Sequence, residues 1–135
     1  MFRAGSTLAR RAAVGRQQTR GMSIAVKNVS SAMECNVGDE GTAEKADLVN
    51  KTLAAKLKEL HAGGYVGYTR MVCKAKWDYK AIHIFSDLDH FKKHIDEDST
   101  SLKAFNDAAS ELKGIVGGDV HTQNFVYEFQ EVKIP

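Results

Sequence analysis

The side chains of this 135-residue chain best suited to acid–base chemistry are histidines, because a neutral imidazole accepts a proton near pH 7. His83 stands in an alternating segment, KAIHIF, that predicts a β-strand with Ile82 and Ile84 on one face. His83 and Phe85 then share the opposite face. If the isoleucines meet the helices, His83 projects into a pocket and orients a phenolic or quinol hydroxyl by hydrogen bonding. The alternative is a structural pair with Glu128 or with a residue of a partner subunit.

His90 and His94 lie four residues apart in a segment that predicts a helix, which is the spacing of a metal-binding pair on one helix face. No carboxylate or third histidine is fixed near them in the sequence, so we predict no metal ion. His94 is a candidate ligand-binding group or general base. The alternative is a partly exposed histidine that Glu97 and Asp98 keep charged.

The tyrosine and cysteine side chains are weaker candidates for ligand binding or catalysis than the histidines. The Tyr68 hydroxyl is a candidate hydrogen-bond donor to a ligand, although an aromatic residue on a sheet face more often serves packing. Cys35 and Cys73 are too few for a disulfide framework. Both alternate in phase with apolar neighbours, so we expect them to be buried and inert.

The elements that must position these residues alternate between strands and helices. Apolar periodicity and glycine pairs predict strands over 31–37 (with 24–29 as an extension), 65–73, 80–85 and 121–129, and helices over 42–60 and 87–114. Thr42 is expected to cap the first helix, and Gly114 to end the last. The acidic run 96–98 divides the second helical region into two pieces.

The resulting order, β-α-β-β-α-β, predicts an α+β fold: a ferredoxin-like sandwich with its helices on one face of a four-stranded sheet. One layer of helices cannot cover both faces of the sheet. The last strand places Phe125, Tyr127 and Phe129 together on one face. The uncovered face must therefore meet water, a ligand or another subunit.

Residues 1–22 have a composition of their own, with five arginines and no Asp or Glu. An arginine-rich, acid-free N-terminus that can form an amphipathic helix is typical of a mitochondrial transit peptide. We therefore predict import into the mitochondrion, most simply its matrix, and a single domain over residues 23–135. The alternative for residues 1–22 is a disordered basic tail that binds nucleic acid or anionic lipid.

The charge of the rest of the chain argues against nucleic acid as a partner. Removing the five N-terminal arginines from the 19 Lys and Arg leaves 14 basic side chains against 17 Asp and Glu, a net charge of −3. No basic stripe is left to bind a phosphate backbone. The sequence also contains no apolar run of the length that spans a membrane.

Two stretches resemble the antibiotic biosynthesis monooxygenase family. Residues 64–68, GYVGY, are similar to the family's sequence at the start of its second strand. Residues 85–94, FSDLDHFKKH, are similar to the family's strand-ending aromatic residue followed nine residues later by a helical histidine. The resemblance covers residues 31–132.

This resemblance implies a dimeric α+β barrel, in which two sheets of a homodimer pack face to face, and a pocket between the uncovered sheet face and the helices. It places His94 at the family's histidine. Phe85 occupies the position of a tryptophan that haem-degrading members use, which argues against haem degradation. Asn36 or Asn28 would supply the asparagine of those members.

Two functions are compatible with these observations, and the sequence leaves open whether the chain is an enzyme. The first is a cofactor-independent monooxygenase acting on a small aromatic or quinol substrate in mitochondria. His83 and His94 would be its catalytic groups, and Phe85, Tyr68 and Asn36 would contact the substrate. The substrate itself would supply electrons to dioxygen, so no cofactor is expected. The second function is a non-catalytic dimerisation module or accessory subunit of a mitochondrial complex.

Overall fold

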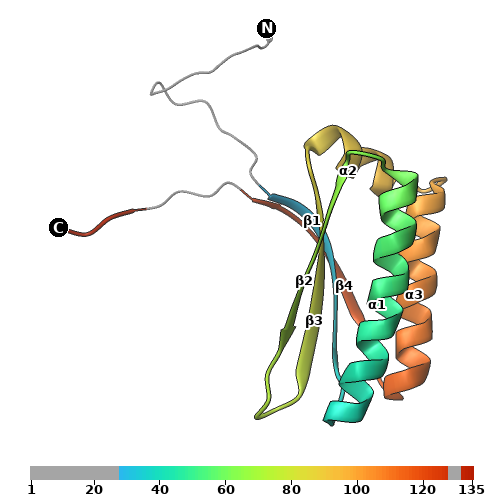
Figure 1. Ribbon diagram of the computed structural model, residues 1–135, viewed down its shortest axis with the longest axis vertical. Coiled ribbons are helices and arrows are strands. Elements are labelled where there is room, and N and C mark those ends of the chain that lie inside the picture. The colour runs from blue at the N-terminus through green and yellow to red at the C-terminus, as the bar shows by residue number, and fades with distance from the viewer. Residues whose placement is uncertain (1–27, 128–131) are drawn as a thin grey trace, which may run out of the picture. The chain divides into compact units, whose positions relative to one another are not determined.

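The structure is a computed structural model that describes residues 28–127 and 132–135. In chain order the elements are β1 (Asn28–Asn36), α1 (Glu40–Leu60), β2 (Tyr65–Val72), β3 (Asp78–Phe85), α2 (Leu88–Ile95), α3 (Thr100–Val116) and β4 (His121–Tyr127). The four strands form one antiparallel sheet in the order β2-β3-β1-β4, and α1 and α3 lie side by side on one face of it (Figure 1). The predicted α+β ferredoxin-like fold is confirmed. The segment predicted as a transit peptide, residues 1–22, lies outside the described residues.

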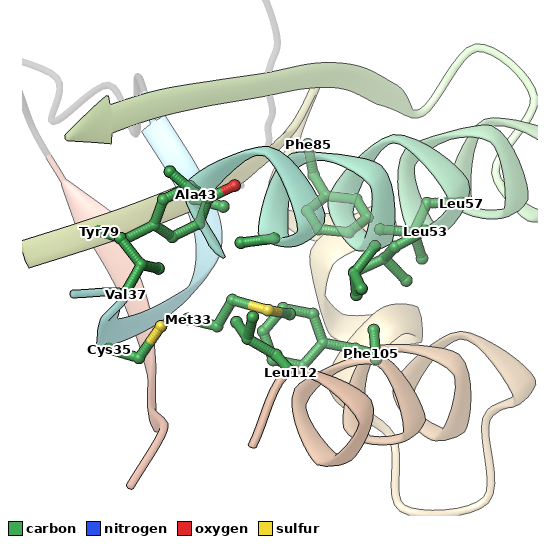
Figure 2. Close-up of a cluster of buried hydrophobic side chains, with 14 of the residues drawn as sticks. Met33, Cys35, Val37, Ala43, Leu53, Leu57, Tyr79, Phe85, Phe105 and Leu112 are labelled. Atoms are coloured by element: carbon green, nitrogen blue, oxygen red, sulfur yellow. The ribbon is translucent and has the colours of Figure 1, made fainter. Parts of the chain in front are cut away.

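The core fills the layer between the helices and the sheet. The apolar stripe of α1, which recurs every three or four residues, is buried there: Ala43, Ala46, Val49, Leu53 and Leu57. From the sheet and α3, Met33, Phe105 and Leu112 lie together against it (Figure 2). Burial of these side chains holds the helices on one face of the sheet.

The helix ends differ from the prediction in two places. Asp39, not Thr42, caps α1: its extended backbone lets the carboxylate accept a hydrogen bond of 2.7 Å from the backbone N–H of Thr42. Helix α3 continues through Gly114 and ends at Val116, and its C-cap is Gly117, whose φ of 70° is the left-handed conformation that favours glycine. The predicted division of the second helical region is confirmed, with Asp87 capping α2 and Ser99 capping α3.

In β3 the face that carries His83 packs against the helices, and the face that carries Ile82 and Ile84 points away from them. Tyr79, Ala81, His83 and Phe85 are all buried against the helical layer, whereas Ile82 and Ile84 are only partly buried on the other face. The imidazole is stable in the core because Asn50 of α1 and Tyr65 of β2 bond to its two ring nitrogens, which offsets the cost of burying a polar ring. His83 therefore lies between the sheet and the helices.

On the other sheet face, β4 places Phe125 next to Ser30 of β1. Phe125 is partly buried, and the Lys80 ammonium lies 5.9 Å from its ring centroid. Tyr127 ends β4, and Phe129 lies outside the described residues. Within the described residues, no helix is long and apolar enough to cross a membrane.

The two cysteines have different surroundings. Cys35 is buried in the core, and this burial raises the pKa of its thiol to about 11. Cys73 is exposed after the end of β2, so the prediction that both thiols are buried is wrong for this residue. Its position at the start of the β2–β3 turn, outside the pairing region, accounts for the difference.

Candidate functional site

The central feature of the site is His83, whose side chain is fully buried and uses both ring nitrogens. Its Nε2 lies 2.8 Å from Oδ1 of Asn50 on α1, and its Nδ1 lies 2.7 Å from the hydroxyl of Tyr65 on β2. Asn50 Nδ2 donates to the Ala46 carbonyl at 3.1 Å, which fixes Oδ1 as the acceptor facing His83. His83 Nε2 must then carry the proton, and Nδ1 accepts a hydrogen bond from the Tyr65 hydroxyl.

The hydrogen bonds continue from Asn50 to the protein surface. Asn50 Nδ2 donates to the Tyr79 hydroxyl at 3.3 Å, and Tyr79 donates to Oδ1 of Asp47 at 2.9 Å. Arg70 donates from Nε to the same carboxylate oxygen at 2.7 Å, in an ion pair that is partly exposed. We call this set the His83 network: Tyr65, His83, Asn50, Tyr79, Asp47 and Arg70.

From the Tyr65 hydroxyl to the Asp47 carboxylate, every hydrogen bond of the His83 network points the same way. Aligned hydrogen bonds polarise one another, and here the series ends on a negative charge that Arg70 compensates. The alignment makes His83 Nδ1 a fixed acceptor rather than one of two interchangeable nitrogens. The network can thus orient a hydroxyl group presented to His83.

The electrostatics keep the buried rings of the network neutral. Burial lowers the pKa of His83 to about 3, and the neighbouring His94 acts in the same direction. Burial raises the pKa of both Tyr65 and Tyr79 well above the ordinary value, and for Tyr79 the hydrogen bond to Asp47 adds to the rise. At pH 7 the site therefore contains a neutral imidazole and two protonated phenols.

A second group of polar side chains lies on the same side of the sheet. The Ser101 hydroxyl is 2.7 Å from His61 Nε2 and also contacts His94 Nδ1, so it bridges the two imidazoles by hydrogen bonds. We call His61, His94 and Ser101 the His94 cluster. Burial lowers the pKa of His94 to about 4, with a further contribution from His61. The predicted alternative, a histidine kept charged by Glu97 and Asp98, is therefore not what the structure shows.

Aromatic rings connect the network with the cluster. Phe85 stacks on His94 with 4.7 Å between ring centroids, and the Phe105 ring stands edge-on to both His83 and His94 at 6.1 and 5.6 Å. The Nε2 atom of His94 is buried and has no hydrogen-bond partner among the described residues. An unpaired polar atom in a core marks a position where a small polar group would be stabilised.

The structure brings together four of the five residues predicted for the site: His83, His94, Phe85 and Tyr68. The Tyr68 ring stacks on His83 with a centroid distance of 5.0 Å. Asn36 lies elsewhere, at the exposed end of β1, where its side chain donates to the Lys76 carbonyl at 2.7 Å and to Asp78.

Asn36 lines a surface depression of about 600 Å³ that Cys73, His121 and neighbouring residues also border. The other asparagine considered, Asn28, is the first residue of β1, and the structure does not describe its side chain. The predicted alternative partner of His83, Glu128, lies outside the described residues. Among the residues that are described, no three His, Cys, Asp or Glu side chains come close enough to hold a metal ion.

Sequence reasoning missed Asn50, Tyr65 and Ser101. The signal for Asn50 was available, because it falls on the buried stripe of α1 between Ala46 and Leu53, where a polar residue needs a partner. Tyr65 belongs to the predicted strand 65–73 and to the family-like stretch 64–68, and neither pattern assigns its side chain to the site. Ser101 carried no signal, since a hydroxyl in the first turn of a helix is common.

Comparison with solved structures places this site in a known fold. A Caulobacter crescentus protein given as a candidate antibiotic biosynthesis monooxygenase is 19% identical, with a TM-score of 0.51 over 76% of this chain and 91% of that one. SnoaB from Streptomyces nogalater, a cofactor-independent oxygenase solved as a point mutant, is 18% identical, with a TM-score of 0.53 over 77% and 96%. The chain shares the α+β ferredoxin-like fold of these two proteins. The resemblance predicted from residues 64–68 and 85–94 is confirmed at that level.

A dimeric ferredoxin-like protein from an uncultured marine organism is 10% identical and has a TM-score of 0.51, over 80% of this chain and 94% of that one. No protein-family model matches the chain, and no curated protein does. The likeness therefore rests on three-dimensional arrangement, and the chemistry must be argued from the site itself.

Proposed function

We propose that the chain is a cofactor-independent monooxygenase that acts on a small planar phenol or quinol. The observation that carries the proposal is the orientation of His83, whose Nδ1 is held as a hydroxyl acceptor by Asn50 and is flanked by two tyrosine rings. A planar phenol matches such a position, because its ring stacks on aromatic neighbours while its hydroxyl donates to Nδ1. SnoaB, which has the same fold, is a cofactor-independent oxygenase, so this fold is compatible with such chemistry.

The proposed reaction needs only the substrate and dioxygen. A quinol and O₂ give a hydroxyquinone and water: one oxygen atom is inserted into a ring C–H bond, the other leaves as water with the two hydroxyl hydrogens of the quinol, and the quinol supplies all four electrons. His83 accepts the hydroxyl proton as the substrate becomes an electron-rich anion. The pKa of His83 is about 3 without such a neighbour, and a negative charge beside the ring raises it. The imidazolium and the substrate anion therefore stabilise each other.

His94 is the second proposed catalytic group. Its ring lies against Phe85, and its unpaired Nε2 offers a hydrogen-bonding position in the same layer. A partly reduced oxygen species formed near this nitrogen would gain a hydrogen-bond partner in an otherwise apolar environment. We assign it the role of stabilising such a species, with His83 holding the substrate.

The test is the formation of 2-hydroxy-1,4-naphthoquinone from 1,4-naphthohydroquinone under ¹⁸O₂ with the full chain. Uncatalysed oxidation gives the quinone and peroxide instead, so the labelled hydroxyquinone reports enzymatic oxygen insertion. We expect the His83→Ala/His94→Ala variant to form it at least about 100-fold more slowly, as for loss of acid–base groups. His121→Ala, on the exposed end of β4, is the matched control. Equal rates in the wild type and the double variant would refute the proposal.

We further propose a homodimer formed through the sheet face that the helices leave open. Ile82 and Ile84 lie on this face only partly buried, and Phe125 lies beside them across β1. The dimeric state of the ferredoxin-like neighbour supports the arrangement. Sedimentation equilibrium should give twice the chain mass, and Ile84→Asp should give the monomer, because an unpaired carboxylate is costly in an apolar interface.

A second candidate function, a non-catalytic subunit of a mitochondrial complex, is favoured by one observation. His83 and His94 are both 0% exposed, and the aromatic rings around them fill the space in which a substrate would react. Mitochondrial location rests on the composition of residues 1–22. Native electrophoresis of mitochondria that contain the tagged chain distinguishes the two functions: co-migration with a large assembly supports the subunit, and a free dimer supports the enzyme.

A further inference from the structure

The Tyr65 hydroxyl donates to Nδ1, the acceptor nitrogen of the His83 ring. His83 Nε2 is committed to Asn50, and the Tyr65 hydroxyl lies 2.7 Å from the remaining nitrogen, Nδ1. The planes of the two rings are within 26° of parallel. Tyr65 is itself a phenol, and it is placed on His83 as the proposed substrate would be.

We propose that Tyr65 is a built-in occupant of the substrate position, and that a planar phenol binds by displacing the Tyr65 side chain from His83. The proposal rests on the proposed function for the chemical class of the ligand. It explains why His83 is fully buried in a chain whose site must admit a ligand: in the resting state the position is already filled by an internal phenol.

The position of Tyr65 in the fold allows this displacement. Tyr65 begins β2, the edge strand of the sheet, and its side chain is partly exposed. The pairing of β2 with β3 shifts register between Tyr65 and Gly67, whose φ of 146° is open to glycine and strained for other residues. A side chain at the edge of a sheet, beside such an irregularity, can turn towards solvent while the paired strand stays in place.

The space that the Tyr65 side chain leaves can hold a planar aromatic ring with one hydroxyl group. Its walls are His83, Phe85, whose ring is edge-on to Tyr65 at 5.6 Å, and Tyr68, which stacks on His83. Because Asn50 fixes Nδ1 as an acceptor, the ligand must donate a hydrogen bond. Phenols and quinols meet this requirement, and their methyl ethers do not.

The proposal predicts that removing one hydroxyl group strengthens ligand binding, whereas an ordinary packing change in a binding site weakens it. Tyr65→Phe keeps the ring but loses the hydrogen bond that competes with the ligand. Binding of 1-naphthol to the full chain, followed by the fluorescence of the ligand, should therefore be about 2-fold to 10-fold tighter in Tyr65→Phe than in the wild type. Binding of 1-methoxynaphthalene should show no such gain. Tyr68→Phe, which removes a hydroxyl from the same strand, should not tighten binding of 1-naphthol.

Unchanged or weaker binding of 1-naphthol by Tyr65→Phe overturns the proposal. If that variant does not fold, NMR of the wild type decides: on saturation with 1-naphthol the Tyr65 ring signals must move towards those of an exposed tyrosine, and unmoved signals overturn the proposal. Tighter binding without hydroxyquinone formation would leave the Tyr65 proposal standing and refute the monooxygenase. Hydroxyquinone formation without tighter binding would refute the Tyr65 proposal and leave the monooxygenase standing.

Discussion

Acidification from pH 7 to pH 5 is predicted to destabilise the fold by about 4 kcal/mol, because two buried histidines must stay neutral in the folded chain. Burial lowers the pKa of His83 to about 3 and that of His94 to about 4, from an ordinary value of 6.5. At pH 5 both His83 and His94 are protonated in the unfolded chain, and both are almost fully neutral in the folded chain. The stability is thus fully present above pH 6.5 and is lost as the pH falls.

The magnitude depends little on how far each pKa is lowered. At pH 5 the ordinary value of 6.5 lies about 1.5 pH units above the solution, and each unit is worth about 1.4 kcal/mol per histidine. Each of the two residues therefore costs the fold about 2 kcal/mol, provided that its folded pKa lies below about 5. His61, whose pKa is also lowered by burial, changes the stability in the same direction.

Urea unfolding of the full chain at pH 7, 6 and 5 measures the effect, with the free energy of unfolding extrapolated to water at each pH. His83→Gln is less stable at every pH, but its difference between pH 7 and pH 5 should shrink by about 2 kcal/mol because one titrating group is gone. His121→Gln removes an exposed histidine and serves as the control. A wild-type difference below about 1 kcal/mol, or the same difference in His83→Gln, would show that the buried imidazoles are not neutral.

Two further substitutions test local features by urea unfolding at pH 7. Gly114→Ala should stabilise the chain by about 0.5–1 kcal/mol, because Gly114 lies inside α3 with open space where a Cβ would stand; lower stability would mean that the helix ends there after all. Asn50→Leu should destabilise by about 1–3 kcal/mol, because the buried N–H of His83 loses its acceptor, and an unchanged free energy would contradict the proposed tautomer.

The fold was predictable because its elements are marked by strong local signals. The apolar stripe of α1 and the glycine pair that follows it, for example, place a helix and its end from residue types alone. Cap positions were less certain. Asp39 and Thr42 are both good cap residues three positions apart, and only the carboxylate's hydrogen bond to the Thr42 N–H distinguishes them.

The site was predictable only in part, because alternation along a strand does not identify the face that is covered. In β3 the hydrophobic effect alone favours burial of the isoleucines at 82 and 84. The structure instead buries His83 and Phe85, since Phe85 packs on His94 and His83 is bonded on both sides. A choice between the faces requires the residues of the opposing helix layer, which belong to distant parts of the sequence.

Asn50 and His83 illustrate the information that such a choice requires. Considered separately, each is an anomaly: an amide on the apolar stripe of a helix, and an imidazole in the middle of an apolar strand. Together, 33 residues apart, each removes the cost of burying the other. A polar residue on the buried stripe of one element thus predicts a polar residue on the facing element. By this reasoning the amide on α1 indicates from residue types alone that the histidine face of β3 is the covered one.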